Sequence, residues 1–386
     1  MSSNKQRFTW KLPAILMGIG FMACNPTNRE ITWEQLEPIP PAAGKTNQPG
    51  LAGALCGVSN NCLIVAGGAN FEEGLPWEGA TKVYHDEVFV LSAGDDHQWI
   101  EHQAKLPLAM GYSACIETEK GIFCAGGENA AGIMDQTMLI EYSSDEIHFQ
   151  PLSPMPEALS SAAIANIGQT IYLAGGLGHQ GAVNSFYAYD LTQDQWQRLP
   201  SLPTPLSHAL LVAQKDGEET ALFLLGGRCK TGELTTFHNQ IWKYRPSESK
   251  WVAAGNISIE ETQMGWAAGT TLPYGNQTIL LFGGDDGILY NKTENYLNLI
   301  EETLDAEKRS EVVQQKNQHL ANHPGFNRMI LQYNTITEEI SVLGQLPDAA
   351  QVTTRAIWWQ NRVVIPSGEI RPGVRTPKVW CGNVQQ

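Results

Sequence analysis

Six apolar runs in this chain end in a tight glycine turn, and this recurrence constrains the fold more than any other feature. Five runs, such as IYLA and LFLL, lead directly into a glycine doublet, and the sixth leads into Ser367-Gly368. A strand that ends in a doublet at this period is typical of a β-propeller blade. In a propeller, the loops of all blades converge at the mouth of one central channel. The doublets are Gly67-Gly68, Gly126-Gly127, Gly175-Gly176, Gly226-Gly227 and Gly283-Gly284.

Aromatic residues recur at a fixed distance after the doublets. Tyr189 and Tyr244 are each followed seven residues later by a tryptophan, Trp196 and Trp251. Large rings in equivalent places allow each sheet to bury its face against the next one. A β-sandwich with scattered turn glycines does not explain this recurrence, so we expect an all-β, kelch-type β-propeller.

The number of blades follows from the two ends of the chain. The last unit has three strands, near 356–359, 363–366 and 378–381, and lacks a fourth. The segment ITWEQLEPIP at 31–40 has the tryptophan and proline ending of a fourth strand. We expect this N-terminal strand to complete the C-terminal blade and remove the open edges. The sequence thus predicts one six-bladed domain over 31–386.

A polar insertion interrupts the repeat at 291–325. Leu297, Ile300 and Leu304 recur there at helical intervals, which predicts one or two amphipathic helices in a blade loop. The sequence leaves two interpretations open, a solvated decoration of the surface and a lid over the channel mouth.

The N-terminal segment has the pattern of a targeting signal. Basic residues precede the short apolar run 12–22, and Ala23 precedes Cys24. The run is too short to span a membrane comfortably. Residues 1–24 resemble a bacterial lipoprotein signal with Cys24 as the lipidation site and 25–30 as a tether; secretion with cleavage nearby is the alternative. Either interpretation predicts an exported protein, in the periplasm or at the outer membrane.

Six cysteines remain, and four of them flank two predicted hairpin turns. Cys56 and Cys62 flank one turn, and Cys115 and Cys124 flank the other. Each pair could form a cross-strand disulfide in an exported protein, although buried cysteine also serves as a small apolar residue. Both interpretations remain open. None of the spacings predicts a zinc site.

The net charge of the chain limits the kinds of molecule that it is expected to bind. The net charge of −15 argues against nucleic acid, because like charges repel. Arginines at blade-loop positions could still bind a small anion in one cavity. These arginines are Arg228, Arg355, Arg371 and Arg375.

The densest group of charged residues is SGEIRPGVRTPKVW, from Ser367 to Trp380. Pro372-Gly373 predicts a turn that brings Arg375 back toward Glu369. A carboxylate and a guanidinium would then pair in a confined site. A purely structural salt bridge has the same sequence pattern.

Several motifs together resemble the N-acetylneuraminate epimerases, or sialic-acid mutarotases, in their cyclically permuted branch. The motifs are GGANF at 67–71, PWEGA at 76–80, the polar insertion, and GEIRPGVRT at 368–376. The resemblance implies interconversion of the α and β anomers of sialic acid, with Glu369 as the proton acceptor and Arg375 as its catalytic partner.

Anomer interconversion needs only acid/base groups to open and close the sugar ring, so we expect a sugar-acid ligand and neither metal nor cofactor. Arg355, Arg228 or Arg371 could contact the substrate carboxylate. A sialidase is excluded because its SxDxGxTW boxes do not occur, and a non-catalytic glycan-binding propeller is the alternative. Candidate binders of the hydroxyl and N-acetyl groups are Asn70, Glu128, Asn129, His208, Gln263 and Asp285.

Overall fold

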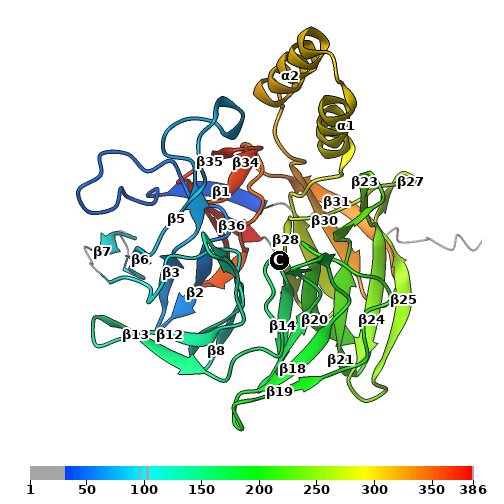
Figure 1. Ribbon diagram of the computed structural model, residues 1–386. Coiled ribbons are helices and arrows are strands. Elements are labelled where there is room, and N and C mark those ends of the chain that lie inside the picture. Colours follow the sequence, from blue (N-terminus) through cyan, green and yellow to red (C-terminus); the bar gives the residue numbers. More distant parts are fainter. Residues whose placement is uncertain (1–30, 95–96, 101–103, 385–386) are drawn as a thin grey trace, which may run out of the picture.

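Six antiparallel sheets surround a central axis in the computed structural model, which describes residues 31–94, 97–100 and 104–384 (Figure 1). The six-bladed β-propeller expected from the doublets is therefore confirmed. The predicted signal 1–24, its Cys24 and the tether 25–30 lie outside the described residues. Among the described residues, no helix combines the length and apolar character needed to cross a membrane.

Each blade has four strands, and the first strand of each lies nearest the axis. Blade 1 contains β2 (Leu55–Ser59), β3 (Cys62–Ala66), β6 (Val88–Leu91) and β7 (Trp99–Ile100). Blade 2 contains β8 (Ala114–Thr118), β9 (Gly121–Ala125), β12 (Thr137–Ser143) and β13 (Glu146–Leu152). Blade 3 contains β14 (Ala163–Ile167), β15 (Thr170–Ala174), β18 (Phe186–Asp190) and β19 (Gln195–Arg198). Blade 4 contains β20 (Leu210–Asp216), β21 (Glu219–Leu225), β24 (Gln240–Arg245) and β25 (Lys250–Asn256). Blade 5 contains β28 (Thr270–Tyr274), β29 (Thr278–Phe282), β30 (Met329–Asn334) and β31 (Ile340–Gln345).

Blade 6 combines both ends of the chain. It contains β32 (Ile357–Trp359), β33 (Arg362–Pro366), β36 (Val379–Val384) and, as its fourth strand, β1 (Ile31–Leu36). The β1–β36 ladder runs from Ile31 opposite Val384 to Leu36 opposite Val379. The predicted closure by the N-terminal strand is therefore confirmed, and it leaves blade 6 without a missing strand.

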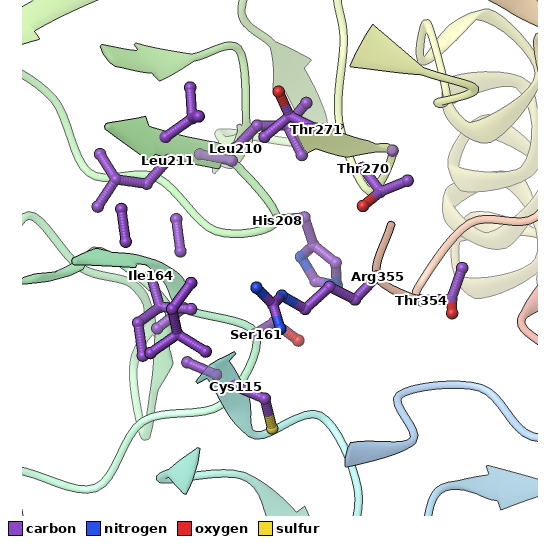
Figure 2. Close-up of a pocket in the computed structure, with 18 of the residues that line it drawn as sticks. Cys115, Ser161, Ile164, His208, Leu210, Leu211, Thr270, Thr271, Thr354 and Arg355 are labelled. Atoms are coloured by element: carbon purple, nitrogen blue, oxygen red, sulfur yellow. The ribbon is translucent and has the colours of Figure 1, made fainter. Parts of the chain in front are cut away.

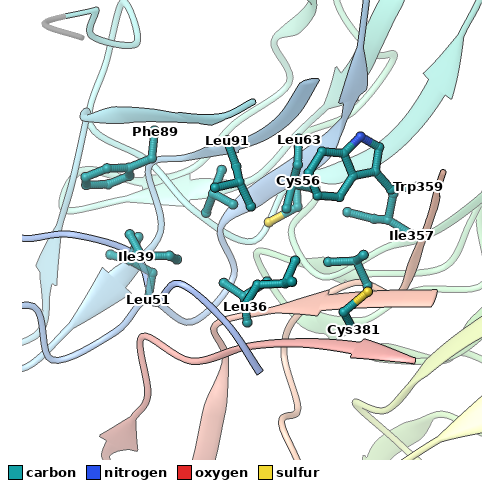
Figure 3. Packing of buried hydrophobic residues seen from close by; sticks show 13 residues of the cluster. Leu36, Ile39, Leu51, Cys56, Leu63, Phe89, Leu91, Ile357, Trp359 and Cys381 are labelled. Carbon is teal, nitrogen blue, oxygen red and sulfur yellow. The ribbon is translucent and has the colours of Figure 1, made fainter. Parts of the chain in front are cut away.

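The hydrophobic core lies between neighbouring blades. The second strands are almost continuously apolar and buried, because both of their faces are covered by adjacent sheets. Figure 3 shows one such layer, in which Leu36 and Trp359 of blade 6 pack with Leu63 and Phe89 of blade 1. The recurring aromatics occupy these layers as expected. Phe186 of blade 3, for example, contacts Tyr244 of blade 4 with ring centroids 4.9 Å apart.

The two cysteine pairs differ in register. Cys56 lies opposite Val65, and Cys62 lies opposite Ser59, so these two cysteines do not face each other, and the cross-strand disulfide that the sequence leaves open for them is not formed. The reason is that the turn consists of Asn60 and Asn61 alone, which moves the centre of the hairpin. Cys115 does lie opposite Cys124, and the two thiols are 3.2 Å apart. All six cysteines of the described residues are free thiols.

Small hairpins follow the glycine turns of five blades, and two helices take their place in blade 5. The hairpins are β4 (Ala69–Asn70) with β5 (Val83–Tyr84), β10 (Glu128–Asn129) with β11 (Gly132–Ile133), β16 (Leu177–Gly178) with β17 (Gly181–Ala182), β22 (Arg228–Thr231) with β23 (Leu234–Phe237), and β34 (Glu369–Arg371) with β35 (Val374–Arg375). A further hairpin, β26 (Ser258–Ile259) with β27 (Thr262–Gln263), follows blade 4, and a 3-10 turn, η1 (Pro76–Glu78), lies between β4 and β5.

The helical insertion consists of α1 (Ile288–Glu302) and α2 (Ala306–Ala321). The predicted helices are thus present, and α1 begins at Ile288, before the polar segment 291–325. The helix begins earlier because the carboxylates of Asp285 and Asp286 accept hydrogen bonds from the backbone of Gly287 and Ile288. Figure 1 shows α1 and α2 standing beside hairpin β34–β35 on one side of the ring.

A closed ring of backbone hydrogen bonds surrounds the axis where the first strands begin. Each blade contributes one residue in the left-handed conformation, and its N–H donates to the carbonyl of the equivalent residue in the preceding blade, at 2.7–3.1 Å. We call these six residues the collar. Because every blade takes part, the collar fixes the loops of all six blades relative to one another. The collar consists of Gly53, Tyr112, Ser161, His208, Ala268 and Thr353.

Candidate functional site

A second ring of residues lies next to the collar and supplies the charged groups of the site. The residue directly after each glycine turn forms an antiparallel bridge with the residue just before the collar residue of its blade. The six positions are thus equivalent around the axis. We call them the post-doublet ring, which consists of Ala69, Glu128, Leu177, Arg228, Asp285 and Glu369.

Glu369 and Arg375 face each other across hairpin β34–β35. They are opposite in the register, and Nη1 of Arg375 lies 3.4 Å from Oε1 of Glu369. The backbone N–H of Gly373 donates to the same oxygen at 2.8 Å. The pairing predicted from the Pro372-Gly373 turn is therefore present, and one hydrogen bond together with one ion pair fixes the orientation of the carboxylate.

The guanidinium of Arg375 is buried and only partly used. Its side chain is 4% exposed, and Cζ lies 4.6 Å from the ring centroid of Phe71, the last residue of the GGANF motif. Within the described residues, Nε and Nη1 of Arg375 make no hydrogen bond. A buried guanidinium with unused donors is suited to bind an anion.

Glu369 lines a cavity of about 330 Å³, which lies between the helical insertion on one side and the collar and post-doublet ring on the other. Arg228 and Asp285, which precede Glu369 in the post-doublet ring, line the same cavity. The opposite wall comes mainly from the insertion and is largely apolar. A sugar acid is of the size that such a cavity holds. The residues of this wall include Leu289, Tyr290, Thr293, Leu297, Leu320, His323 and Phe326.

Arg228 is a cation without a carboxylate partner. Its Cζ lies 4.7 Å from the ring centroid of Tyr290, and its Nη2 lies 3.4 Å from Nε2 of His208. Among the described residues, no carboxylate oxygen comes within 4.0 Å of this guanidinium. Burial, with Arg228 adding to the effect, holds the pKa of His208 well below its usual value. The imidazole is therefore neutral, and Arg228 is the free positive charge of this part of the cavity.

Asp285 lies between Arg228 and Glu369 in the ring. Its Oδ1 accepts a hydrogen bond from the N–H of Gly287 at 2.9 Å. Burial raises the pKa of the Asp285 carboxyl above its ordinary value, while the Gly287 N–H and Arg228 act in the opposite direction. The cavity is thus lined by three carboxyl groups, those of Asp285, Glu369 and, from α1, Glu294, whose oxygens accept hydrogen bonds from the backbone N–H and the hydroxyl group of Thr235.

Tyr112 of the collar is a member of the site that the sequence reasoning missed. Burial raises its pKa to about 12, Glu369 adds to this shift, and Arg375, which hydrogen-bonds the phenol, opposes it. Tyr112 therefore remains a neutral phenol beside the Glu369–Arg375 pair. His208, which was predicted, is the collar residue of blade 4, so comparing the equivalent positions of the repeats would have found Tyr112.

Glu128 occupies the post-doublet position of blade 2, but its oxygens are already occupied. Oε1 accepts hydrogen bonds from Tyr84 at 2.6 Å and Lys82 at 3.1 Å, and Oε2 accepts one from Ser160 at 3.0 Å. The Glu128 carboxylate of blade 2 therefore connects residues of blades 1 and 3 at the mouth of the central channel.

The two remaining candidate arginines lie outside the cavity. Arg355 lines a second cavity, which runs along the first strands beyond the collar (Figure 2). It makes a two-pronged pair with Glu117, in which both distances are 2.7 Å. Arg371 donates to the backbone carbonyl of Ala321 at 3.4 Å, which links hairpin β34–β35 to the end of α2.

Three polar candidates make local contacts. Asn70 is buried, its Nδ2 donates to the carbonyl of Gly50, and its Oδ1 accepts a hydrogen bond from Nε2 of His85. Asn129 caps its own turn by accepting from the N–H of Ala131, and Gln263 is exposed in β27. Across residues 31–94, 97–100 and 104–384, no three His, Cys, Asp or Glu side chains converge as a metal site would require.

Comparison with known proteins places this geometry in a family. The family described as N-acetylneuraminate epimerase matches residues 22–149 and 152–386. An N-acetylneuraminate epimerase of Salmonella enteritidis PT4 is 35% identical over 114 residues, which is 27% of this chain and 29% of the relative. One of Vibrio vulnificus is 35% identical over 107 residues, 25% of this chain and 27% of the relative. The aligned segment thus spans under a third of each relative.

Proposed function

This chain belongs to the N-acetylneuraminate epimerase family, and we propose that it catalyses the interconversion of the α and β anomers of N-acetylneuraminate. The proposal is carried by one observation. A carboxylate, Glu369, and a buried guanidinium with unused donors, Arg375, line or adjoin a cavity of sugar size at the axis of the propeller.

Glu369 is the general base in this proposal. Its carboxylate takes the proton of the anomeric hydroxyl, the bond between the anomeric carbon and the ring oxygen breaks, and the ring oxygen receives a proton. The open keto acid rotates about the bond to its carbonyl carbon and closes on the other face, with the proton transfers reversed. No covalent intermediate or redox step is needed.

Arg228 and Arg375 have different roles in this proposed mechanism. Arg228 has no carboxylate partner among the described residues and binds the carboxylate of the substrate. Arg375 holds Glu369 in place, and its unused donors stabilise the negative charge that develops on the substrate oxygens. The apolar wall formed by α1 and α2 covers the sugar and acts as a lid, which is one of the two interpretations that the sequence leaves open for the insertion.

The test is a measurement of anomer exchange by NMR. Freshly released α-sialic acid is added to the protein, and the growth of the β anomer is followed. We expect acceleration by the wild type and a loss of about 10²–10⁴-fold in kcat for Glu369→Gln. The matched control is Glu117→Gln, which breaks another Glu–Arg pair away from this cavity and keeps the activity. A protein that only binds glycans leaves the spontaneous rate unchanged, and this result would refute the proposal.

We also propose that the protein is exported and anchored by a lipid on Cys24, because the N-terminal pattern of residues 1–24 is that of a lipoprotein signal. Fractionation of cells expressing the full chain tests this. The wild type should follow the membranes, and Cys24→Ala should lose the anchor. A wild type recovered entirely in a soluble fraction contradicts the proposal.

A further inference from the structure

Opening a cyclic hemiketal requires two proton transfers on two oxygens of the same carbon. One proton leaves the anomeric hydroxyl, and another reaches the ring oxygen. In the function proposed above, Glu369 performs the first transfer. We propose that Asp285 is the second catalytic residue, the acid that protonates the ring oxygen and takes this proton back when the ring closes. This inference rests on the proposed function.

The repeat places Asp285 in the right position. Asp285 and Glu369 occupy the same post-doublet position in blades 5 and 6, where they bridge to Ala267 and Val352. Arg228 occupies that position in blade 4, and all three line one cavity. Asp285 is thus the middle member of a row of three, with the free cation on one side and the base on the other.

The substrate carries three groups on one carbon that correspond to this row. The anomeric carbon of a 2-keto sugar acid bears a carboxylate, a hydroxyl group and the ring oxygen. When Arg228 binds the carboxylate and Glu369 faces the hydroxyl group, the ring oxygen lies toward the third residue on the same wall of the cavity. That residue is Asp285.

The surroundings of Asp285 suit a proton donor. Oδ1 accepts from the Gly287 N–H, and Oδ2 makes no hydrogen bond with any described residue. Burial favours the protonated form, and so does the charge of Glu369. Glu128, at the same position in blade 2, has both oxygens occupied and a lysine partner, so it cannot take this role. The titratable and charged groups around Asp285 are Asp286 in its own loop, Arg228 in β22, His208 in the collar, Glu369 in β34, and Tyr290, Glu294 and His323 of the insertion.

The proton balance closes over one turnover. The anomeric O–H proton passes to Glu369 as the C=O bond forms, and the electron pair of the breaking C–O bond stays on the ring oxygen, which takes the proton of Asp285. After rotation, the former ring hydroxyl returns its proton to Asp285 and attacks the carbonyl, whose oxygen takes the proton from Glu369. Both carboxyl groups end as they began.

The experiment compares the pH dependence of kcat for the wild type, Asp285→Asn and Asp286→Asn, measured by the same NMR exchange assay with the spontaneous rate subtracted. Thermal unfolding and binding of the β anomer show that each variant is folded. For Asp285→Asn we expect a kcat about 10²–10⁴-fold lower and the loss of the alkaline limb of the profile, because asparagine can donate a hydrogen bond but not its proton. Asp286→Asn is the matched control, since Asp286 bonds the backbone N–H two residues ahead, as Asp285 does. Asp286→Asn should keep the wild-type kcat and both limbs of the pH profile. Its alkaline limb should move to lower pH, because the charge of Asp286 raises the pKa of Asp285 and is absent in this variant.

Three results would overturn the assignment while leaving the epimerase function intact. They are an unchanged kcat in Asp285→Asn, a higher KM with kcat unchanged, and a lower kcat with the alkaline limb preserved. A wild type that does not accelerate anomer exchange refutes the proposed function itself, so the two failures are distinguishable.

Discussion

Gly373→Ala tests how the turn of hairpin β34–β35 positions the carboxylate of Glu369, the proposed base. Gly373 has φ +76°, and a Cβ there would lie 2.6 Å from Cδ and 2.7 Å from Cγ of Pro76 in η1. The left-handed conformation costs an alanine about 1–2 kcal/mol. The overlap with the rigid proline ring adds about 1–3 kcal/mol. If the hairpin yields instead, the Gly373 N–H leaves Glu369, and a shift of about 1 Å in the carboxylate lowers kcat about 10²-fold.

The matched control is Gly232→Ala in hairpin β22–β23. Gly232 has nearly the same φ, +71°, but its Cβ would meet nothing within 4 Å. It should therefore lose only the conformational cost of about 1–2 kcal/mol and keep its kcat. Urea unfolding followed by tryptophan fluorescence and the NMR exchange assay measure the two effects. If Gly373→Ala matches Gly232→Ala in both stability and kcat, the contact with Pro76 does not position Glu369.

Three further changes test other parts of the structure. Asp285→Asn should unfold at higher urea than the wild type at pH 7, because the raised pKa means that ionising this buried carboxyl costs stability; the difference should vanish below the ordinary value of 3.8, where the wild-type carboxyl is protonated in both states. Oxidised glutathione at alkaline pH should join Cys115 to Cys124, whose thiols are 3.2 Å apart, and peptide mapping without reduction would reveal any other pair instead. Trp33→Ala should destabilise the ring by ~3 kcal/mol, since Trp33 of β1 packs edge-on against Phe282 of blade 5, and an unchanged urea midpoint would show that β1 contributes little to closure.

The fold could be predicted because its signals are local and repeated. A glycine doublet marks a left-handed turn that few other residues adopt, and five doublets together with the equivalent Ser367-Gly368 reveal the number of blades. Closure by β1 followed from counting strands. The start of α1 could not be predicted from apolar spacing, since the capping bonds of Asp285 and Asp286 set it. The Cys56 register failed for a similar reason, because the turn length decides which residues face each other.

The site was predictable where its residues are neighbours in sequence and obscure where they are not. Glu369 and Arg375 share one hairpin, so a turn motif was enough to pair them. Arg355 and Arg228 both follow the pattern of loop arginines, yet only the folded ring shows that Arg355 is held by Glu117 beyond the collar. Which side of the collar a residue faces depends on contacts between distant blades, and no local pattern encodes it. Tyr112 differs in this respect, since it occupies the collar position of blade 2 that His208 occupies in blade 4, and a comparison of the repeats identifies it.

The helical insertion and the chemistry of Asp285 are physically connected. The insertion emerges from blade 5 directly after Asp285, and its residues Tyr290 and His323 wall the cavity that this carboxyl faces. Burial is the largest cause of the raised pKa of Asp285, so the wall that would cover the sugar also raises the pKa of the proposed acid. An equivalent carboxyl in a blade with only a small hairpin, Glu128, instead pairs with Lys82. The proposed base and acid thus occupy one equivalent position in two blades, where the residue type and the segment that covers the blade both differ.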